Sequence, residues 1–211
     1  MVVAIDGPDG AGKSTVARRI AEELGFRYLD TGAMYRALTW LAIERSLSLD
    51  DGPRLAELGR GHPVAFRGDT VLVAGTDVTT AIREARIDRV VSSVARHPEV
   101  RVLMRERQRE LANEGDAVVE GRDIGTVVCP DAELKVYLVA DERERARRRA
   151  SERPSLAGDA LATDLRWRDE RDAAQLRAAA DAVEIDTTSL TVDDVVAKIV
   201  AMARGRSDRA G

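Results

Sequence analysis

The sequence feature that most constrains this chain is a glycine-rich segment near its start, Gly-Pro-Asp-Gly-Ala-Gly-Lys-Ser at positions 7–14. It matches the pattern G-x-x-x-x-G-K-[ST] and follows a short apolar run at 2–5 that predicts a buried strand. Apolar residues then recur at helical spacing over 13–24, and Gly25 supplies a stop. A strand, a glycine-rich turn and a helix in this order predict a loop whose backbone N–H groups bind phosphate.

Two side chains of this loop have distinct expected roles. Lys13 is one of only three lysines in the chain and would reach the β and γ phosphates of a nucleotide. The Ser14 hydroxyl would ligate Mg²⁺. A glycine-rich turn with an incidental lysine is the alternative, and the complete match in the right context disfavours it. The predicted nucleotide-binding residues are Gly7, Pro8, Asp9, Gly10, Ala11, Gly12, Lys13, Ser14 and Thr15.

Strands and helices alternate along the rest of the chain. Apolar runs at 26–29, 117–119, 134–139 and 183–185 predict four more strands. This alternation predicts an α/β fold, with a five-stranded parallel sheet and helices on both faces. The expected helices lie at 32–47, near 55, and at 82–96, 98–113, 142–153, 161–178 and 192–204, with a frayed tail at 204–211.

The segment at 63–80 does not fit the parallel sheet. Apolar residues at 64–66 and 71–73 flank a Gly-Asp turn, which predicts a hairpin. We expect a small lobe inserted between two helices.

Composition excludes several classes of protein. The net charge of −4 gives no general attraction for anions, so local cations must hold any anionic ligand. Aromatic residues make up 3% of the chain, which leaves little surface for stacking on nucleic acid bases. No apolar run approaches the roughly 20 residues of a membrane span, and no leader precedes the first strand. We therefore expect a cytoplasmic protein that binds neither nucleic acid nor membrane.

Four further clusters point to an acceptor for phosphate. They are Tyr-Leu-Asp-Thr-Gly-Ala-Met-Tyr-Arg at 28–36, Ser92 with Arg101, Glu-Gly-Arg-Asp-Ile-Gly-Thr at 120–126, and Arg-Asp-Glu-Arg-Asp at 168–172. On the motifs L-D-[ST]-G-x-x-Y-R, G-R-D-x-G-T-x-[VI] and R-D-x-x-D, the chain resembles bacterial cytidylate kinases from about Val2 to Met202. The resemblance implies transfer of phosphate from ATP to CMP or dCMP, with Mg²⁺, by a monomer. One departure is Gln175, where the family commonly has arginine.

The resemblance also implies roles for individual residues and segments. The implied CMP-binding residues are Asp30, Thr31, Tyr35, Arg36, Ser92, Arg101, Arg122, Asp123, Arg168 and Asp172. Arg36 and Arg122 would hold the phosphate; Ser92, Arg101 and Asp123 would read the base; Arg168 and Asp172 would meet the sugar. The implied catalytic residues are Lys13, Arg36, Arg122 and Arg149, and Arg148 joins the ATP site. A single domain would comprise a core at about 1–35, 101–150 and 179–211, an acceptor-binding insert at 36–100 and a lid at 150–170.

The residue types agree with cytosine as the acceptor base. A carboxylate suits the amino group of cytosine, and an arginine suits its ring acceptors. Uracil would place a carbonyl oxygen against the Asp123 carboxylate and leave buried polar groups without partners. Two arginines on one monophosphate would give bidentate, charge-assisted bonds.

Several alternatives stay open from sequence. The acceptor could be UMP, dTMP or a shikimate-like molecule, or the chain could be a nucleotide-dependent switch. The arginines at 143–149 could bind RNA or form a solvated helix face. Asp123 could simply pair with Arg122, and Arg168 with Asp172, four residues apart, could form a surface salt bridge.

Overall fold

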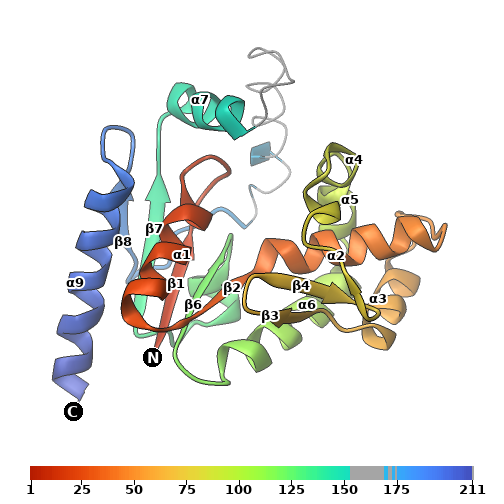
Figure 1. The fold of residues 1–211 in the computed structure, drawn as a ribbon, viewed down its shortest axis with the longest axis horizontal. Helices are drawn as coiled ribbons and strands as arrows, with labels where there is room; N and C mark the ends of the chain where they lie inside the picture. Colours follow the sequence, from red (N-terminus) through yellow and green to blue (C-terminus); the bar gives the residue numbers. More distant parts are fainter. Residues whose placement is uncertain (153–168, 171–172, 174, 211) are drawn as a thin grey trace. The chain divides into compact units, whose positions relative to one another are not determined.

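The computed structural model describes residues 1–152, 169–170, 173 and 175–210 (Figure 1). Its main sheet has the strand order β2-β6-β1-β7-β8. The strand β1 pairs in parallel with β6 and β7, and β7 pairs in parallel with β8. The predicted five-stranded parallel sheet is confirmed, and its strands are β1 Val2–Asp6, β2 Arg27–Asp30, β6 Ala117–Gly121, β7 Leu134–Val139 and β8 Val183–Asp186.

The chain divides into two compact units. The first, which we call the sheet unit, comprises Met1–Leu29 and Ala112–Gly211. The second, the insert unit, comprises Asp30–Leu111. The functional boundaries expected for the acceptor-binding insert at 36 and 100 stay a prediction.

The insert unit carries the predicted hairpin, extended by a third strand. The residues expected only to turn, at 75–77, include a short strand that pairs through Thr76 with Val73 and through Asp77 with Leu72. The result is a small antiparallel sheet in the order β3-β4-β5. The elements of this part of the chain are α2 Thr31–Glu44, α3 Gly52–Gly61, β3 Ala65–Arg67, β4 Thr70–Val73, β5 Thr76–Asp77, η1 Ala81–Arg83, α4 Ala85–Asp88, α5 Val91–Ala95 and α6 Pro98–Ala112.

The single helix predicted over 82–96 is wrong. The segment is broken into η1, α4 and α5, and Glu84 between the first two has an extended backbone with ψ of 148°. Ile82 and Ile87 are both fully buried, although their spacing of five residues does not match one face of a continuous helix. Tertiary burial of these apolar side chains has therefore overridden the local helical pattern.

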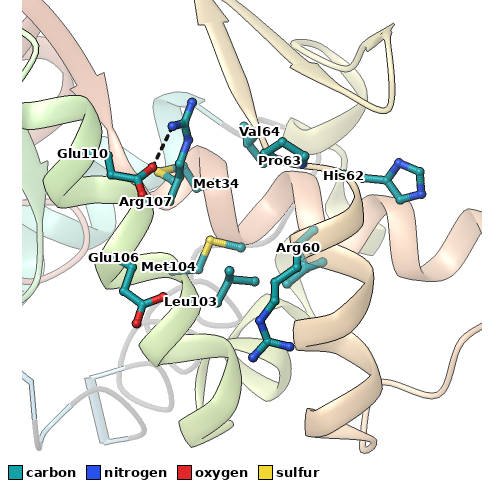
Figure 2. Close-up of a pocket in the computed structure, with 12 residues that line it drawn as sticks. Met34, Arg60, His62, Pro63, Val64, Leu103, Met104, Glu106, Arg107 and Glu110 are labelled. Atoms are coloured by element: carbon teal, nitrogen blue, oxygen red, sulfur yellow. Dashed lines mark hydrogen bonds and ion pairs between the residues drawn. The ribbon is translucent and has the colours of Figure 1, made fainter.

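A pocket of about 350 Å³ lies within the insert unit, lined by residues of α2, α3 and α6 (Figure 2). Met34 and Met104 are buried and form part of its apolar lining, while Arg60 and Glu106 add charged groups. Among the acceptor-binding residues predicted from the sequence, those that the structure describes do not line this pocket.

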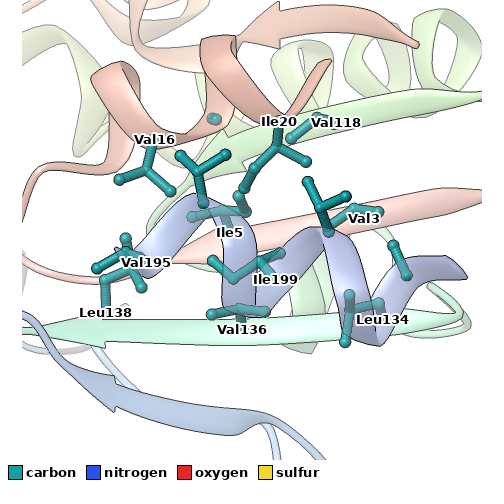
Figure 3. Packing of buried hydrophobic residues seen from close by; sticks show 14 of the residues in the cluster. Val3, Ile5, Val16, Ile20, Val118, Leu134, Val136, Leu138, Val195 and Ile199 are labelled. Atoms are coloured by element: carbon teal, nitrogen blue, oxygen red, sulfur yellow. The ribbon is translucent and has the colours of Figure 1, made fainter. Parts of the chain in front are cut away.

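The core of the sheet unit lies between the sheet and two helices, α1 Lys13–Leu24 and α9 Val192–Ala210. These helices contact each other, and Ile20 and Ile199 pack with Ile5 of the central strand (Figure 3). Ala4 and Val119 point to the opposite face of the sheet and are also fully buried. Both faces are therefore covered, as parallel sheets require.

The last helix begins with the predicted capping box. The Thr191 hydroxyl accepts from the Asp194 backbone N–H (3.2 Å), and the Asp194 carboxylate accepts from the Thr191 backbone N–H (3.1 Å). The frayed tail expected from residue 204 is wrong, because α9 continues to Ala210. No helix in the described part of the chain is long and apolar enough to cross a membrane.

The helix predicted over 161–178 lies largely outside the described residues. Its last residues, 176–178, are described and are not helical. They lead toward Asp181, whose carboxylate accepts from the Lys135 ammonium at 2.9 Å, and then into β8. The end of the predicted helix at 176–178 is therefore wrong.

Candidate functional site

The phosphate-binding loop predicted at 7–14 follows β1 directly, and two of its glycines are required by close packing. Gly7 has a φ of 146°, and a Cβ there would lie 2.2 Å from the backbone oxygen of Leu138. Gly10 has a φ of 79°, and a Cβ there would lie 2.9 Å from the Cβ of Arg145. Side chains at these positions would push the loop away from β7 and α7 Glu142–Glu152, so glycine is needed for its path.

The loop ends at the N-terminus of α1, which suits an anion. Gly12 precedes the helix in the left-handed region, with a φ of 90°, and makes no side-chain cap. The first turn of α1 contains no acidic residue. The N–H groups and the positive end of the helix dipole therefore have no competing carboxylate of their own helix.

Lys13 is folded back across this loop. Its ammonium donates to the Pro8 carbonyl at 2.8 Å, and the side chain is buried. Burial lowers the pKa of Lys13 to about 8, and the positive charge of Arg122 acts in the same direction. Asp9, Glu120 and other carboxylates oppose this shift. The Lys13 ammonium therefore lies at the loop, next to the place where the phosphates of a nucleotide would bind.

The Ser14 hydroxyl donates to the Glu120 carboxylate at 2.8 Å, and the Tyr28 hydroxyl donates to the same oxygen at 3.0 Å. A hydroxyl and a carboxylate are hard oxygen ligands of the kind that Mg²⁺ prefers. Within the described residues no group of three or more His, Cys, Asp and Glu side chains could hold a metal. The Ser14 hydroxyl and the Glu120 carboxylate thus fit Mg²⁺ bound together with nucleotide phosphates.

Arg122 lies after β6 and reaches the phosphate-binding loop. Its guanidinium donates to the Asp9 carboxylate at 2.6 Å, and both side chains are largely buried. The adjacent Asp123 is buried as well. Asp9, which the sequence assigned to the loop only through its motif, therefore also positions an arginine.

Sequence reasoning missed Asp6, the last residue of β1. Its carboxylate accepts from the backbone N–H groups of Ile124 and Gly125, both at 2.8 Å, at the start of the π-helical turn η2 Ile124–Val128. Burial raises the pKa of Asp6, and these two hydrogen bonds oppose the rise. Asp6 thus fixes the turn that follows Arg122 and Asp123. An acidic residue ending the central strand was the available signal.

The arginines of α7 divide into supporting and exposed groups. Arg145 is buried, donates to the Asp9 carbonyl at 3.1 Å and pairs with Asp169 at 2.7 Å. Arg147 is exposed and pairs with Glu144 of its own helix. The solvated helix face that the sequence left open as an alternative therefore fits Arg147 but not Arg145. The ATP contact of Arg148 and the catalytic role of Arg149, which is half-buried, stay predictions.

Thr187, just after β8, is a second residue that sequence reasoning missed. Its hydroxyl lies 3.2 Å from the Ala11 carbonyl and 3.0 Å from the Val139 carbonyl. Arg148 donates to both the hydroxyl and the carbonyl of Thr187, at 2.9 and 2.7 Å. Thr187 therefore ties the phosphate-binding loop to the end of the sheet.

The remaining described acceptor residues belong to the insert unit. Asp30 caps α2 by accepting from the Ala33 N–H at 2.8 Å, and its second oxygen accepts from Arg83 at 2.5 Å. Arg36 pairs with Asp88 at 2.5 Å. Thr31 is buried at the start of α2, while Tyr35 on α2, Ser92 on α5 and Arg101 on α6 are half-buried. Arg168 and Asp172 lie outside the described residues.

Sheet order, loop and helix together define a P-loop protein, and solved structures with this fold include kinases. A shikimate kinase from Bacteroides thetaiotaomicron has a TM-score of 0.52 at 14% identity, covering 97% of this chain and 98% of that one. A gluconokinase from Sinorhizobium meliloti 1021 has a TM-score of 0.51 at 14% identity, covering 99% and 95%. At this identity the likeness concerns the fold alone.

Sequence comparison identifies the family. The cytidylate kinase profile matches residues 3–205, so the chain belongs to the cytidylate kinase family. A cytidylate kinase from Geobacillus kaustophilus is 48% identical, with 97% of this chain and 96% of the relative covered. One from Bacillus subtilis is 44% identical, with 97% of both covered. The chain also matches 42% of the length of a bifunctional pantoate ligase/cytidylate kinase from Synechococcus sp. (strain RCC307), at 47% identity.

Proposed function

We propose that this protein transfers the γ-phosphoryl group of ATP to CMP and dCMP, giving ADP with CDP or dCDP. The observation that carries the proposal is the match to cytidylate kinases at 44–48% identity, which spans both compact units. The sheet unit supports it with a phosphate-binding loop that ends at a buried lysine. The insert unit supports it with two arginines, each held by a carboxylate.

The donor side rests on positioning and charge. The loop's N–H groups and Lys13 would bind the triphosphate, and Ser14 with Glu120 would hold Mg²⁺ beside it. When bound, Mg²⁺ neutralises charge on the β and γ phosphates. The acceptor phosphate is already a nucleophile, so alignment and charge stabilisation suffice without a covalent intermediate.

On the acceptor side, Arg36 and Arg122 would hold the CMP phosphate, near Asp30, Thr31 and Tyr35. Asp123, with Ser92 and Arg101, would read the base, because a buried carboxylate matches the cytosine amino group and repels the uracil carbonyl. Arg168 and Asp172 would bind the sugar. The resemblance implies that the segment at 150–170 closes as a lid and brings Arg148 and Arg149 toward the triphosphate; residues 153–168 of this segment lie outside the described part of the chain. From the resemblance to bacterial cytidylate kinases, we further propose a cytoplasmic monomer.

The test is release of ADP measured with CMP, dCMP, UMP, AMP, GMP, dTMP and no acceptor. We expect turnover with CMP and dCMP far above turnover with UMP and the purines. Equal rates with UMP would show a different acceptor. Hydrolysis at the same rate without any acceptor would show an ATPase instead.

A further inference from the structure

A buried carboxylate on α4 has no place in the function described so far. The Asp88 side chain is 0% exposed, and one of its oxygens accepts from Arg36 Nη1 at 2.5 Å. The Arg36 side chain is 15% exposed. Removing a carboxylate from water costs several kcal/mol unless a well-placed cation compensates, so the position of the Arg36 guanidinium is tightly linked to Asp88.

We propose that Asp88 is a positioning residue that orients Arg36 for the phosphate of the acceptor nucleotide. This inference rests on the proposed function, in which Arg36 binds that phosphate. Asp88 itself would not touch the substrate.

The geometry leaves Arg36 able to bind a second anion. A guanidinium carries five N–H donors in a fixed plane, and Asp88 engages one nitrogen. Among the residues that the structure describes, Arg36 has no other hydrogen-bond partner. Its remaining donors can therefore meet a phosphate in the bidentate manner that suits arginine.

The packing of α2 against α4 holds Arg36 and Asp88 next to each other. Arg36 lies on α2 and Asp88 on α4, and α2 contacts both α4 and α5. A free arginine side chain has about 2 kcal/mol of rotamer entropy, part of which is lost when it binds a ligand. Holding the guanidinium in place before the acceptor arrives removes part of that cost from binding.

The ion pair of Arg86 with Glu44 in the insert unit is not buried in this way. Arg86 pairs with Glu44 at 3.2 Å, and the two side chains are 47% and 44% exposed. Exposed pairs of this kind contribute little to stability and hold neither partner firmly. The Glu44–Arg86 pair therefore provides a matched control within the same unit.

Two effects of Asp88 on phosphate binding oppose each other. Its charge offsets the charge of Arg36 and so weakens attraction for an anion, whereas orientation strengthens binding. The proposal requires that orientation prevails. It also requires that the effect depends on the acceptor's phosphate, because a general loosening of the insert unit would affect the nucleoside as well.

The experiment compares Asp88→Asn with wild type and with Glu44→Gln. The quantities are the dissociation constants of CMP and ATP and the inhibition constant of cytidine, which lacks the phosphate. We expect Asp88→Asn to weaken CMP binding by about tenfold or more, equal to about 1.4 kcal/mol. Cytidine and ATP should change by less than about twofold, and Glu44→Gln should change none of the three.

A second background links the effect to Arg36. In an Arg36→Lys protein the planar fork is already lost, so adding Asp88→Asn should weaken CMP binding little further. Should Asp88→Asn fail to fold, Asp88→Glu takes its place; it keeps the charge but displaces the guanidinium, and the same selective loss for CMP is expected.

The possible failures are distinguishable. If wild-type protein neither binds nor phosphorylates CMP, the proposed function is wrong. If wild type behaves as proposed, three results overturn the role of Asp88 alone: equal weakening of CMP and cytidine, tighter CMP binding, or unchanged CMP binding.

Discussion

The two compact units prepare for phosphate in different ways. In the sheet unit, the groups that would meet the triphosphate are backbone N–H groups of a glycine-rich loop and one buried lysine. In the insert unit, the predicted phosphate ligand is an arginine side chain, Arg36, held by the carboxylate of Asp88. A second arginine there, Arg83, pairs with Asp30, but its side chain is 48% exposed against 15% for Arg36.

The two predicted phosphate sites therefore depend on different parts of the structure. A backbone cradle is part of the fold, since Gly7 and Gly10 must fit against β7 and α7. A side-chain site depends on ion pairs that can be altered one at a time. Changes in the sheet unit should therefore affect both stability and ATP, and changes in the insert unit should affect mainly the acceptor.

The largest effect is expected at Lys13, whose ammonium lies against the phosphate-binding loop. Lys13→Met should reduce kcat/KM by roughly 10²-fold or more, about 2.7 kcal/mol of transition-state stabilisation. Lys198→Met, on the exposed side of α9, is the control and should leave the rate unchanged. Full activity of a folded Lys13→Met protein would contradict the proposal that the phosphate-binding loop and Lys13 bind the triphosphate.

Replacing residues 63–80 by a short turn tests the insert unit. The small sheet contacts α2 through β4, and α2 carries Tyr35 and Arg36. CMP affinity should fall by about 30-fold, about 2 kcal/mol, while ATP affinity changes by less than about threefold. Calorimetric titration of each nucleotide measures both. Equal loss for the two would mean that the units do not bind their ligands separately.

Two arginines on α7 test whether the phosphate-binding loop depends on contacts with this helix. Arg145→Ala removes a buried donor to the Asp9 carbonyl and should lower the free energy of unfolding by about 1–3 kcal/mol. Arg147→Ala, two residues further along α7 on its exposed face, should leave the free energy of unfolding unchanged. Urea titration of both variants provides the comparison. Similar curves for the two would show that α7 does not support the loop.

The smallest effect is the response to pH. Because the pKa of Lys13 is lowered to about 8, kcat/KM for ATP should fall by up to about tenfold per pH unit above that value. Stability should respond in the opposite direction. An unfolded Lys13 keeps its proton up to its ordinary pKa of 10.5, so between 8 and 10.5 the unfolded state binds more protons. The contribution of Lys13 to the free energy of unfolding therefore rises with pH.

The Lys13→Met protein is the control for this profile. Without the ammonium, the change in ATP binding near pH 8 should disappear, although the rate itself is low. A change that persists in the variant would belong to another group.

The sheet and the phosphate-binding loop could be predicted because their determinants are local. Five apolar runs, a motif at 7–14 and a stop at Gly25 each lie within a few residues. The capping box of α9 was predicted for the same reason, since Thr191 and Asp194 lie within one turn. The end of that helix was not, because no local signal stops it before Ala210.

The side-chain contacts that hold the predicted site residues in place could not be predicted, because they join residues that are far apart in the sequence. Arg36 and Asp88 are 52 residues apart, and Ser14 and Glu120 are 106 apart. A sequence pattern shows that each residue is charged or polar but not which partner it meets. The break at Glu84 belongs here as well, because burial of Ile82 and Ile87 decides it rather than local propensity.

The position of Thr187 has a consequence for the order in which the protein matures. Its hydroxyl lies 3.2 Å from the carbonyl of Ala11, a loop residue 176 positions earlier in the chain. A chain growing on the ribosome therefore lacks this tie until the 176 residues that follow Ala11 have been made. Domains generally fold as units during translation, and here the phosphate-binding loop gains this contact only after β8 has been added. Nascent chains that end before Thr187 should carry the loop without this support.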